Sequence, residues 1–399
     1  YSPDGELHLV GHPEQDYPRL FGLWKEEAVG SLNQVAPDLD RSVFSLAGGA
    51  ISLPKWSDGE VFTVLEDAGR VTVVRIDQEG KVAESVGGDR VVTGFDVASD
   101  RLVAAITSAD LPAEIFDFRE GSEERLTHHS ATLEIGVRPT IHWRAAGDGP
   151  QIDTFMVMPE GDGPFPVLLN IHGGPASQYG FGFFDEFQVY AGAGYAVVAC
   201  NPRGSSGRGL EFVRSVVGDG WGVVDLSDIL AALENALSSY PQLDRTRMGI
   251  MGGSYGGFMT AWAIAHDDRF KAAVVERALL SFPSFEGTSD IGPIFTPNYV
   301  QSDDLEAKWA KSPLKYVDQI VTPTLVLHSE EDYRCPIEQA EQLLTSLLKR
   351  GIEAEMVRFP GEGHELSRSG KPRHRVERFE VILEWHDRLL AAAETTPVD

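Results

Sequence analysis

The sequence predicts two parts, an all-β region over residues 1–128 and a doubly wound α/β domain with a mostly parallel sheet over residues 129–399. Two observations predict this division. The first part contains short alternating strands separated by turns, with no amphipathic run of helix length. In the second part, apolar strands alternate with helical stretches, a pattern that calls for a parallel sheet covered on both faces.

A weak repeat runs through the first part. Residues 1–5, 56–60 and 97–101 each form a turn signal followed by an apolar strand. Their spacing brackets the period of about 40 to 50 residues expected for the four-stranded blades of a β-propeller. We therefore interpret this region as part of a β-propeller, with a small β-sandwich as the alternative.

The length of this region limits how much of a propeller it can hold. A propeller needs at least four blades, and at about 45 residues a blade this region holds fewer than three. Open blade edges would expose unpaired backbone groups, which soluble proteins avoid. We therefore expect the chain to be the C-terminal piece of a longer polypeptide whose N-terminal blades complete the propeller.

The second part contains eight predicted strands and three clear helices. Residues 126–140 show no strong period and look like the crossing between the two parts. The strands are expected at 140–146, 152–159, 165–173, 195–204, 247–253, 271–278, 323–329 and 353–359, and the helices at 223–237, 339–350 and 375–393.

The composition excludes several classes of partner. With 61 acidic against 34 basic residues, the formal net charge is -27, so the field of the whole molecule repels nucleic acid and anionic lipid. No apolar run reaches the roughly 18 residues that a membrane span needs, and no export signal is visible. We therefore expect neither nucleic acid nor membrane as a partner, and a cytoplasmic location.

Cysteine usage gives no sign of a disulfide framework or a metal site. Cys200 and Cys335 are the two cysteines, and neither lies in a metal-ligand spacing or a Cys-x-x-Cys pair. Both are expected to be reduced thiols, and no cofactor or metal is expected.

The stretch "RMGIMGGSYGGFMTAW" places Ser254 at a predicted turn from strand to helix. Such a turn strains the backbone, and the close packing of strand against helix leaves no room for side chains at Gly252 and Gly256. The serine hydroxyl is then lifted above the carboxyl edge of the sheet, beside the free N–H groups of the helix N-terminus. This is the nucleophile elbow of an α/β-hydrolase.

A serine nucleophile needs a base and an acid, which in this fold follow it in the chain as acid and then histidine. His364 lies in a Gly-rich loop after a predicted strand, whereas His374 and His386 fall in or beside the terminal helix and are interpreted as surface residues. Glu330, Glu331 and Asp332 compete for the acid. We favour Asp332, because a shorter side chain deeper in the loop suits a rigid orienting role.

The oxyanion of an acyl-transfer reaction also needs hydrogen-bond donors. The glycine-rich segment "NIHGGPASQYG" follows the apolar run "FPVLL" at 165–169 and supplies N–H groups at the sheet edge. The second donor is the N–H of Tyr255, the residue after the nucleophile. The side chain of His172 is interpreted as holding the loop.

Five motifs, taken together and in order, give a family resemblance. They are "HGGP" at 172–175, "NPRGSSGRG" at 201–209, "GGSYGG" at 252–257, "HSEEDYRCP" at 328–336 and "GEGH" at 361–364. With them the chain resembles the prolyl oligopeptidase family of serine peptidases, most of all its acylaminoacyl-peptidase branch. The first part resembles the end of the propeller that members of this family carry before the hydrolase domain.

The resemblance implies roles for individual residues. It assigns Ser254, Asp332 and His364 as the catalytic triad, and the N–H groups of Gly174 and Tyr255 as the oxyanion hole. It implies that Arg334 reaches the substrate pocket, with a surface loop arginine as the alternative. It also implies that a propeller caps the active site, so that substrates are short unfolded peptides.

The segment 277–295 lies where such enzymes build their specificity pocket. Its apolar side chains could form a slot for a bulky substrate residue or could equally be the core of a lid: Phe282, Phe285, Ile291 and Phe295. A desolvated Arg334 facing such a slot could bind an acyl carbonyl or pair with the terminal carboxylate of a peptide.

The expected function is therefore a serine peptidase working through an acyl-enzyme on oligopeptide substrates, as an acylaminoacyl-peptidase-like exopeptidase or an oligopeptidase. The alternatives are carboxypeptidase-like release through Arg334, a carboxylesterase, and a propeller interaction module joined to an inactive hydrolase domain. A homo-oligomer and the missing N-terminal propeller blades are the further partners that we expect.

Overall fold

The computed structural model describes residues 1–12, 17–45, 52–99, 101–132 and 136–391. Contacts divide the chain into two units: unit 1 comprises 1–140, 176–185 and 203–215, and unit 2 comprises 141–175, 186–202 and 216–399. The domain boundary after residue 128 stays a prediction. Three stretches with predictions from the sequence lie outside the described residues. They are Asp100 in the third repeat, 133–135 in the crossing segment, and 392–393 in the predicted terminal helix.

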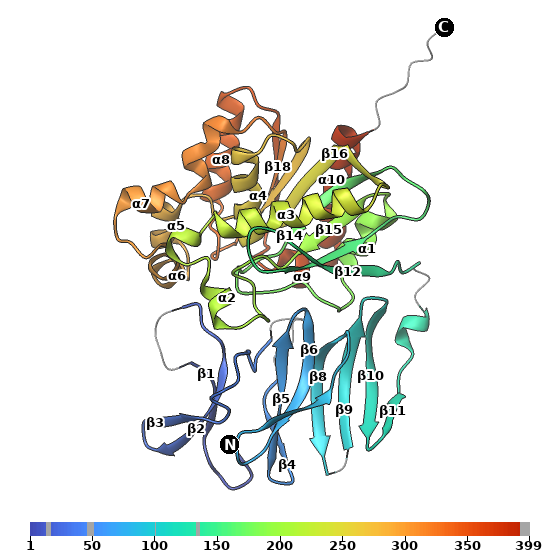
Figure 1. Cartoon of the computed structure of the whole chain (residues 1–399). Helices are drawn as coiled ribbons and strands as arrows, with labels where there is room; N and C mark the ends of the chain where they lie inside the picture. Colours follow the sequence, from blue (N-terminus) through green and yellow to red (C-terminus); the bar gives the residue numbers. More distant parts are fainter. Residues whose placement is uncertain (13–16, 46–51, 100, 133–135, 392–399) are drawn as a thin grey trace. The chain divides into compact units, whose positions relative to one another are not determined.

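The strands of unit 1 pair mostly antiparallel (Figure 1). A three-stranded sheet has the order β1-β2-β3, with β1 His8–Gly11, β2 Gly22–Ala28 and β3 Ser31–Gln34. The eight-stranded sheet contains β4 Lys55–Ser57, β5 Glu60–Asp67, β6 Arg70–Ile76, β7 Val82–Val86, β8 Val91–Ala98, β9 Arg101–Ser108, β10 Leu111–Arg119 and β11 Ser122–Arg125.

This larger sheet is made of two four-stranded meanders. Strands β4 to β7 pair antiparallel in sequence order, and so do β8 to β11. The meanders join through β6 and β8, which pair in parallel at Val71 and Val91. Within the described residues the strands of unit 1 form open sheets and no closed barrel, so a propeller is not confirmed.

Two segments that follow strands of unit 2 belong to unit 1 by their contacts. The segment 176–185, which follows β14, donates the Phe181 N–H to the Gly69 carbonyl oxygen at 2.9 Å. The segment 203–215, which follows β15, accepts the Ala68 N–H at the Gly207 oxygen, also at 2.9 Å. Unit 1 is therefore discontinuous in sequence.

Unit 2 has the predicted mostly parallel sheet, with the order β12-β13-β15-β14-β16-β17-β18-β19. Strand β13 is antiparallel to β15, and the strands from β15 to β19 are parallel. All eight predicted strands are present: β12 Thr140–Ala145, β13 Ile152–Val157, β14 Phe165–Ile171, β15 Ala196–Cys200, β16 Leu243–Gly253, β17 Ala272–Glu276, β18 Thr324–Ser329 and β19 Ala354–Phe359.

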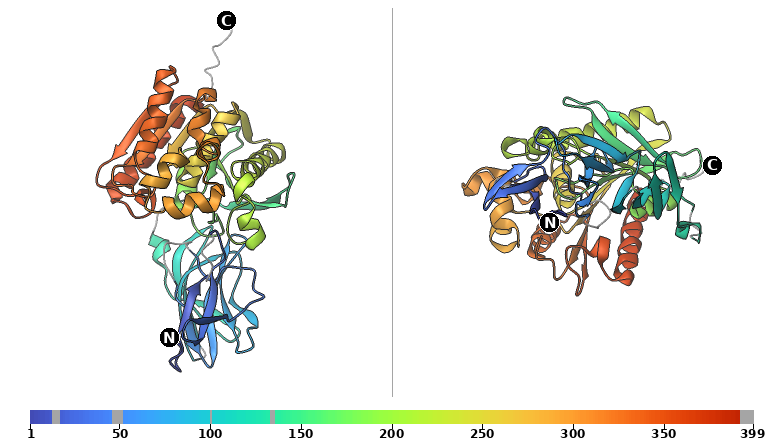
Figure 2. Two further views of the ribbon diagram at one scale, coloured as in Figure 1. Left: turned by 90° about the vertical axis from the view of Figure 1, so that its left-hand side faces the viewer. Right: turned by 90° about the horizontal axis from the view of Figure 1, so that it is seen from below.

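Helices cover both faces of this sheet. On β16, Gly249 faces the ring of His386 on α10, and Gly252 faces the backbone of Gly256 on α4. Because residues 249 and 252 point to opposite faces of a strand, α4 and α10 lie on opposite sides of the sheet. In Figure 2 the yellow-green α3 and the red α10 likewise lie on opposite sides.

The α-helices that the structure describes all follow residue 140 in the sequence: α1 Asp185–Gly192, α2 Leu210–Arg214 (in unit 1), α3 Val224–Ser239, α4 Tyr255–His266, α5 Phe282–Thr288, α6 Gly292–Val300, α7 Leu305–Ala310, α8 Glu338–Lys349, α9 Leu366–Ser369 and α10 Pro372–Leu390. Short 3₁₀ helices are η2 His129–Thr132, η3 Gly218–Gly220 and η4 Pro313–Gln319. The three predicted helices correspond to α3, α8 and α10.

The interpretation of His386 as a surface residue is wrong. Its side chain is fully buried on α10 and packs beside the ring of Tyr195, and neither ring nitrogen has a hydrogen-bond partner among the described residues. The apolar surroundings disfavour the charged ring, and burial lowers the pKa of His386 to about 3. His386 lies on the same buried face of α10 as Ile382 and Trp385. This face is hard to recognise in the sequence because charged residues surround these positions.

Replacing His386 should flatten the pH dependence of stability. Because the pKa of His386 is about 3 in the folded chain and near 6.5 when unfolded, the unfolded state binds the extra proton between these values. As the pH is lowered through this window, the free energy of unfolding of the wild type should therefore decrease. The decrease should be steeper than that of His386→Leu by about 1.4 kcal/mol per pH unit. Urea unfolding at three pH values between 6.5 and 4 measures both slopes, and parallel slopes would contradict the prediction.

Candidate active site

Ser254 lies at a sharp turn between β16 and α4. Its φ of 63° is in the left-handed region, which is strained for a residue with a side chain. The turn is held by two backbone hydrogen bonds, from the Ser254 N–H to the Glu276 oxygen at 3.0 Å and from the Phe258 N–H to the Ser254 oxygen at 2.9 Å.

The two glycines that flank this turn are required by space. A Cβ at Gly256 would lie 2.1 Å from the Ile171 carbonyl oxygen, and one at Gly252 would lie 2.6 Å from the same atom. Since no side chain fits at these distances, the strand and helix can approach closely only with glycine at both positions. The geometry is that of a nucleophile elbow.

The structure brings Ser254, His364 and Asp332 together. The Ser254 hydroxyl lies 3.1 Å from His364 Nε2, and His364 Nδ1 lies 2.8 Å from Asp332 Oδ2. The three residues come from three separate loops, after β16, β18 and β19. The hydrogen-bonded relay has the connectivity that serine activation needs, with a base beside the hydroxyl and a carboxylate behind the base.

The carboxylate of Asp332 is fixed by its own loop. Its Oδ1 accepts the backbone N–H groups of Arg334 at 2.9 Å and Cys335 at 2.8 Å, which leaves Oδ2 for His364. Asp332 is buried, whereas Glu330 and Glu331 of the same turn are exposed. The division of its two oxygens holds the imidazole in one orientation.

His364 is suited to accept a proton. Burial is the largest influence and lowers the pKa of His364, although hydrogen bonding to Asp332 acts in the opposite direction. A neutral ring that donates its Nδ1–H to Asp332 has its lone pair on Nε2, which faces the serine hydroxyl.

The glycine-rich loop after β14 lies against the elbow. A Cβ at Gly173 would lie 3.5 Å from the Ser254 Cβ, and the next residue, Gly174, has a φ of 126°. Tyr255 is the first residue of α4, so its N–H has no acceptor within the helix. The backbone N–H groups of Gly174 and Tyr255 stay our predicted oxyanion donors.

The His172 side chain makes a hydrogen bond within this loop. Its Nδ1 hydrogen-bonds to the Gly173 oxygen at 2.6 Å, and burial lowers the pKa of His172 to about 4. The ring is therefore neutral, as expected for a residue that holds the loop.

Sequence reasoning missed the residue that anchors Tyr255. The Tyr255 hydroxyl donates to the buried carboxylate of Asp225 on α3 at 2.7 Å, and burial raises the pKa of Asp225 to about 6. A signal was present in the sequence, because Asp225 lies on the apolar stripe of α3 with Ile229, Ala232 and Ala236. A carboxylate on the buried face of a helix needs a partner, and here the partner is the residue after the nucleophile.

Arg334 has a partner that the sequence did not indicate. Its Nε and Nη2 lie 2.7 and 3.2 Å from the two carboxylate oxygens of Asp290, and both side chains are partly exposed. Arg334 Nη1 has no hydrogen-bond partner among the described residues, so the other edge of the guanidinium is open. The pair lies beside the triad because the Arg334 N–H binds Asp332.

The predicted specificity residues are mostly packed in a cluster. The side chains of Phe282 and Phe285 are 0% and 1% exposed, and Phe295 is 8% exposed. Phe282 and Phe295 contact the ring of the buried Trp221 at centroid distances of 5.5 and 5.9 Å. Phe282 and Phe285 thus have the packing expected for the lid-core alternative, while Ile291 and Phe295 keep some exposed surface. A specificity role for the four residues stays a prediction.

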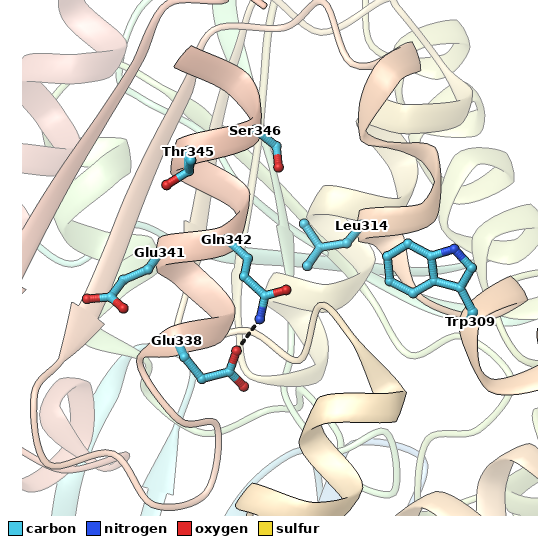
Figure 3. A pocket seen from close by; sticks show the side chains of 7 residues that line it. All are labelled: Trp309, Leu314, Glu338, Glu341, Gln342, Thr345 and Ser346. Carbon is cyan, nitrogen blue, oxygen red and sulfur yellow. Dashed lines mark hydrogen bonds between the residues drawn. The ribbon is translucent and has the colours of Figure 1, made fainter. Parts of the chain in front are cut away.

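A hollow of about 490 Å³ lies beside α8, and none of the relay residues lines it (Figure 3). It is lined by Trp309, Leu314, Glu338, Glu341, Gln342, Thr345 and Ser346. Two of its carboxylates are already bonded, Glu338 to Ser284 and Glu341 to Arg358. The hollow contains none of the residues assigned to chemistry above.

Other groups considered in the sequence lie as follows. Cys200 and Cys335 are free buried thiols, as expected. His374 is partly buried and pairs with Glu362 at 2.6 Å, so it is not a simple surface residue. Among the described residues, no three His, Cys, Asp or Glu side chains form a group that could hold a metal ion, and no helix is long and apolar enough to cross a membrane.

The sheet order, the elbow and the serine–histidine–aspartate relay define an α/β-hydrolase-type domain with a serine-hydrolase site. The chain belongs to the prolyl oligopeptidase family, whose family model matches residues 181–393.

Known proteins of this family align with most of the chain. It is 42% identical over 361 residues to the uncharacterized peptidase YuxL of Bacillus subtilis strain 168, covering 87% of this chain and 55% of that protein. It is 27% identical over 421 residues to dipeptidyl-peptidase 5 of Porphyromonas gingivalis, covering 98% and 58%. The structure of the Pyrococcus horikoshii acylaminoacyl peptidase superposes with a TM-score of 0.88 at 32% identity, covering 98% and 63%. The chain thus spans between about half and two thirds of these proteins.

Removing the imidazole of His364 should abolish the reactivity of Ser254. We expect His364→Ala to label with a fluorophosphonate at a rate lower by a factor on the order of 10⁴ or more, because no base remains beside the hydroxyl. His374→Ala serves as the control and should label within a few-fold of wild type. If His364→Ala keeps its reactivity and the control loses it, the base has been assigned to the wrong histidine.

The labelling rate should also depend on pH in a defined direction. Ser254 is activated only while His364 is neutral, and burial lowers the pKa of His364 below its ordinary value. The rate should therefore stay high below pH 6.5 and decline only as the pH falls through the lowered value. A midpoint above pH 6.5, measured with labelling quenched at timed intervals, would contradict this.

Proposed function

We propose that this chain carries the catalytic domain of a serine peptidase that cleaves short peptides through an acyl-enzyme. The observation that supports this most directly is the relay Ser254–His364–Asp332, with distances of 3.1 and 2.8 Å. Family membership and the peptidase names of the relatives support peptides as substrates over other acyl compounds.

In the proposed reaction, Ser254 Oγ attacks the carbonyl carbon of the scissile peptide bond while His364 Nε2 takes the hydroxyl proton. The carbonyl π electrons move to oxygen, and the N–H groups of Tyr255 and Gly174 stabilise the oxyanion. When the C–N bond breaks, the imidazolium gives its proton to the leaving amine. Water then repeats the sequence on the acyl-enzyme and releases the acid. Asp332 stays ionised and orients the ring throughout.

We further propose that the all-β region contributes propeller blades. The meanders β4–β7 and β8–β11 each have the four antiparallel strands of a blade, and their first strands begin at residues 55 and 91. Because closure needs at least four blades, the others would come from outside this chain, which spans only part of its relatives. A complete propeller would admit short unfolded peptides and exclude folded proteins, as the family resemblance implies.

The preferred substrates are proposed to be N-acylated or otherwise uncharged peptides, as in the acylaminoacyl peptidase that superposes on this chain. The ion pair with Asp290 supports this choice. Asp290 already balances the charge of Arg334. The Nη1 edge of the Arg334 guanidinium stays open, and it suits a neutral carbonyl oxygen as acceptor. A substrate carboxylate at that edge would be repelled by Asp290.

A panel of three peptides with one core sequence tests the proposal in the full-length protein. The peptides are N-acylated with a C-terminal amide, free at the amino end with an amide, and N-acylated with a free carboxylate. We expect kcat/KM to be highest for the first. Preference for the free carboxylate would support carboxypeptidase-like release instead, and turnover of acyl esters without any peptide cleavage would support a carboxylesterase.

The role of Asp290 can be measured with the same panel. Asp290→Asn leaves the charge of Arg334 unbalanced, so kcat/KM for the free-carboxylate peptide should rise about three- to tenfold relative to the amide. Asp318→Asn removes an exposed acid elsewhere in unit 2 and should leave the ratio unchanged. An unchanged ratio in Asp290→Asn would show that the open edge of Arg334 does not meet the substrate's carboxyl end.

A further inference from the structure

A third glycine of the elbow has a neighbour different from that of Gly252 and Gly256. A Cβ at Gly253 would lie 2.8 Å from both the guanidinium carbon and Nη2 of Arg277. The residue directly before the nucleophile therefore lacks a side chain where the guanidinium of Arg277 lies. The turn itself needs no glycine at this position, because Gly253 does not have a positive φ.

Arg277 is a buried cation with few partners. It follows β17, is 7% exposed, and has a φ of 39°, which is strained for a residue with a side chain. Its Nη2 donates to Ser367 Oγ at 3.1 Å, but Nε and Nη1 have no hydrogen-bond partner among the described residues.

The nearest carboxylate does not complete the bonding of Arg277. Glu276 Oε1 lies 3.7 Å from Arg277 Nε, which is beyond hydrogen-bond distance. Both oxygens of Glu276 are instead bonded to Arg378, at 2.8 and 2.7 Å. A buried guanidinium with unsatisfied N–H groups and a strained backbone costs stability, so its place beside the triad points to function.

The contacts of Arg277 join two parts of the site. On one side the guanidinium packs against Gly253 of the elbow. On the other it binds Ser367 on α9, three residues after His364 in the same loop. Its own N–H is fixed to the Leu327 oxygen of β18 at 2.9 Å, the strand that leads to Asp332.

We propose that Arg277 is a positioning residue of the triad, which fastens the His364 loop to the elbow through Ser367 and whose positive charge favours the neutral imidazole. This inference rests on the proposed function, since it concerns the base of the proposed reaction.

The charges around His364 show why a cation is needed there. Asp332 faces the ring from the loop after β18, Glu365 follows it in the chain, Glu276 lies at the end of β17, and Asp290 precedes α6. All four carboxylates favour a protonated ring. After burial and the Asp332 hydrogen bond, the charge of Arg277 is the next influence on the pKa of His364, and it lowers that pKa. Removing the charge of Arg277 would therefore shift the balance toward the protonated ring, although burial would still lower the pKa of His364.

The test separates the charge of Arg277 from its hydrogen bond. We would measure kcat/KM on an N-acylated peptide amide and the fluorophosphonate labelling rate from pH 4.5 to 8 in the full-length protein. Two variants, Arg277→Met and Arg277→Gln, remove the charge. Arg277→Lys keeps the positive charge but lacks the planar guanidinium that binds Ser367. Ser367→Ala removes only the hydroxyl that accepts the hydrogen bond from Arg277. Arg358→Gln is the control, because Arg358 is a partly exposed arginine of β19 that pairs with Glu341.

The uncharged variants should move the acidic midpoint of both rates upward by about 0.5 to 1 pH unit. Ser367→Ala and Arg277→Lys should leave the midpoint in place but lower the plateau several-fold, because the loop is less firmly held. Arg358→Gln should change neither. Circular dichroism and thermal unfolding show which variants are folded, and the conservative Gln and Lys forms keep the test open if the Met form is not.

An unchanged midpoint in a folded uncharged variant would overturn the electrostatic role, and an unchanged plateau in Ser367→Ala would overturn the fastening. These outcomes differ from failure of the proposed function. If the wild-type protein neither labels at Ser254 nor cleaves any peptide, the proposed function fails, whereas a reactive wild type with unchanged variants refutes only the inference about Arg277.

Discussion

The close approach of α4 to the end of β16 is the constraint on which the rest of the site depends. With the Ile171 oxygen 2.1 Å from where a Cβ of residue 256 would be, only glycine permits the helix to begin directly after the strand. The helix then starts at Tyr255, and Ser254 must take its strained backbone conformation. A serine on an ordinary turn would have a hydroxyl of variable direction, whereas here the strain fixes it toward His364.

Burial of polar groups gives this constraint its chemical value. Asp332 divides its oxygens between its loop and the imidazole, and Asp225 holds the ring of Tyr255, whose N–H is a predicted oxyanion donor. Because the low dielectric strengthens these interactions, small displacements of the loops would be costly. Hydrogen bonds thus hold the relay of Ser254, His364 and Asp332 in place, whereas the Arg334–Asp290 ion pair is partly exposed to solvent.

The sequence was most informative where one local rule determines structure. The eight strands of unit 2 and the elbow could be predicted, because apolar strand runs and the space limits at Gly252 and Gly256 are local properties. The relay could be predicted because chain order in this fold limits the base to the histidines after Asp332, and the loop after a predicted strand then separates His364 from His374 and His386 in or beside the terminal helix. What was missed depends on partners distant in sequence. The pairing of Asp290 with Arg334 spans 44 residues, and the burial of His386 depends on its packing against β16. Likewise, nothing near Arg277 in the chain indicates that it will lie against Gly253.

The discontinuity of unit 1 has a consequence for anyone who wishes to study the two halves of this protein separately. The segments 176–185 and 203–215 branch from the strands β14 and β15 yet make their hydrogen bonds with residues such as Ala68 and Gly69. A single cut near residue 140 would therefore separate both segments from the residues to which they hydrogen-bond. Backbone N–H and C=O groups on both sides would then lose their partners. The α/β unit should express better without the first 140 residues if the segments 176–185 and 203–215 are also shortened to tight turns.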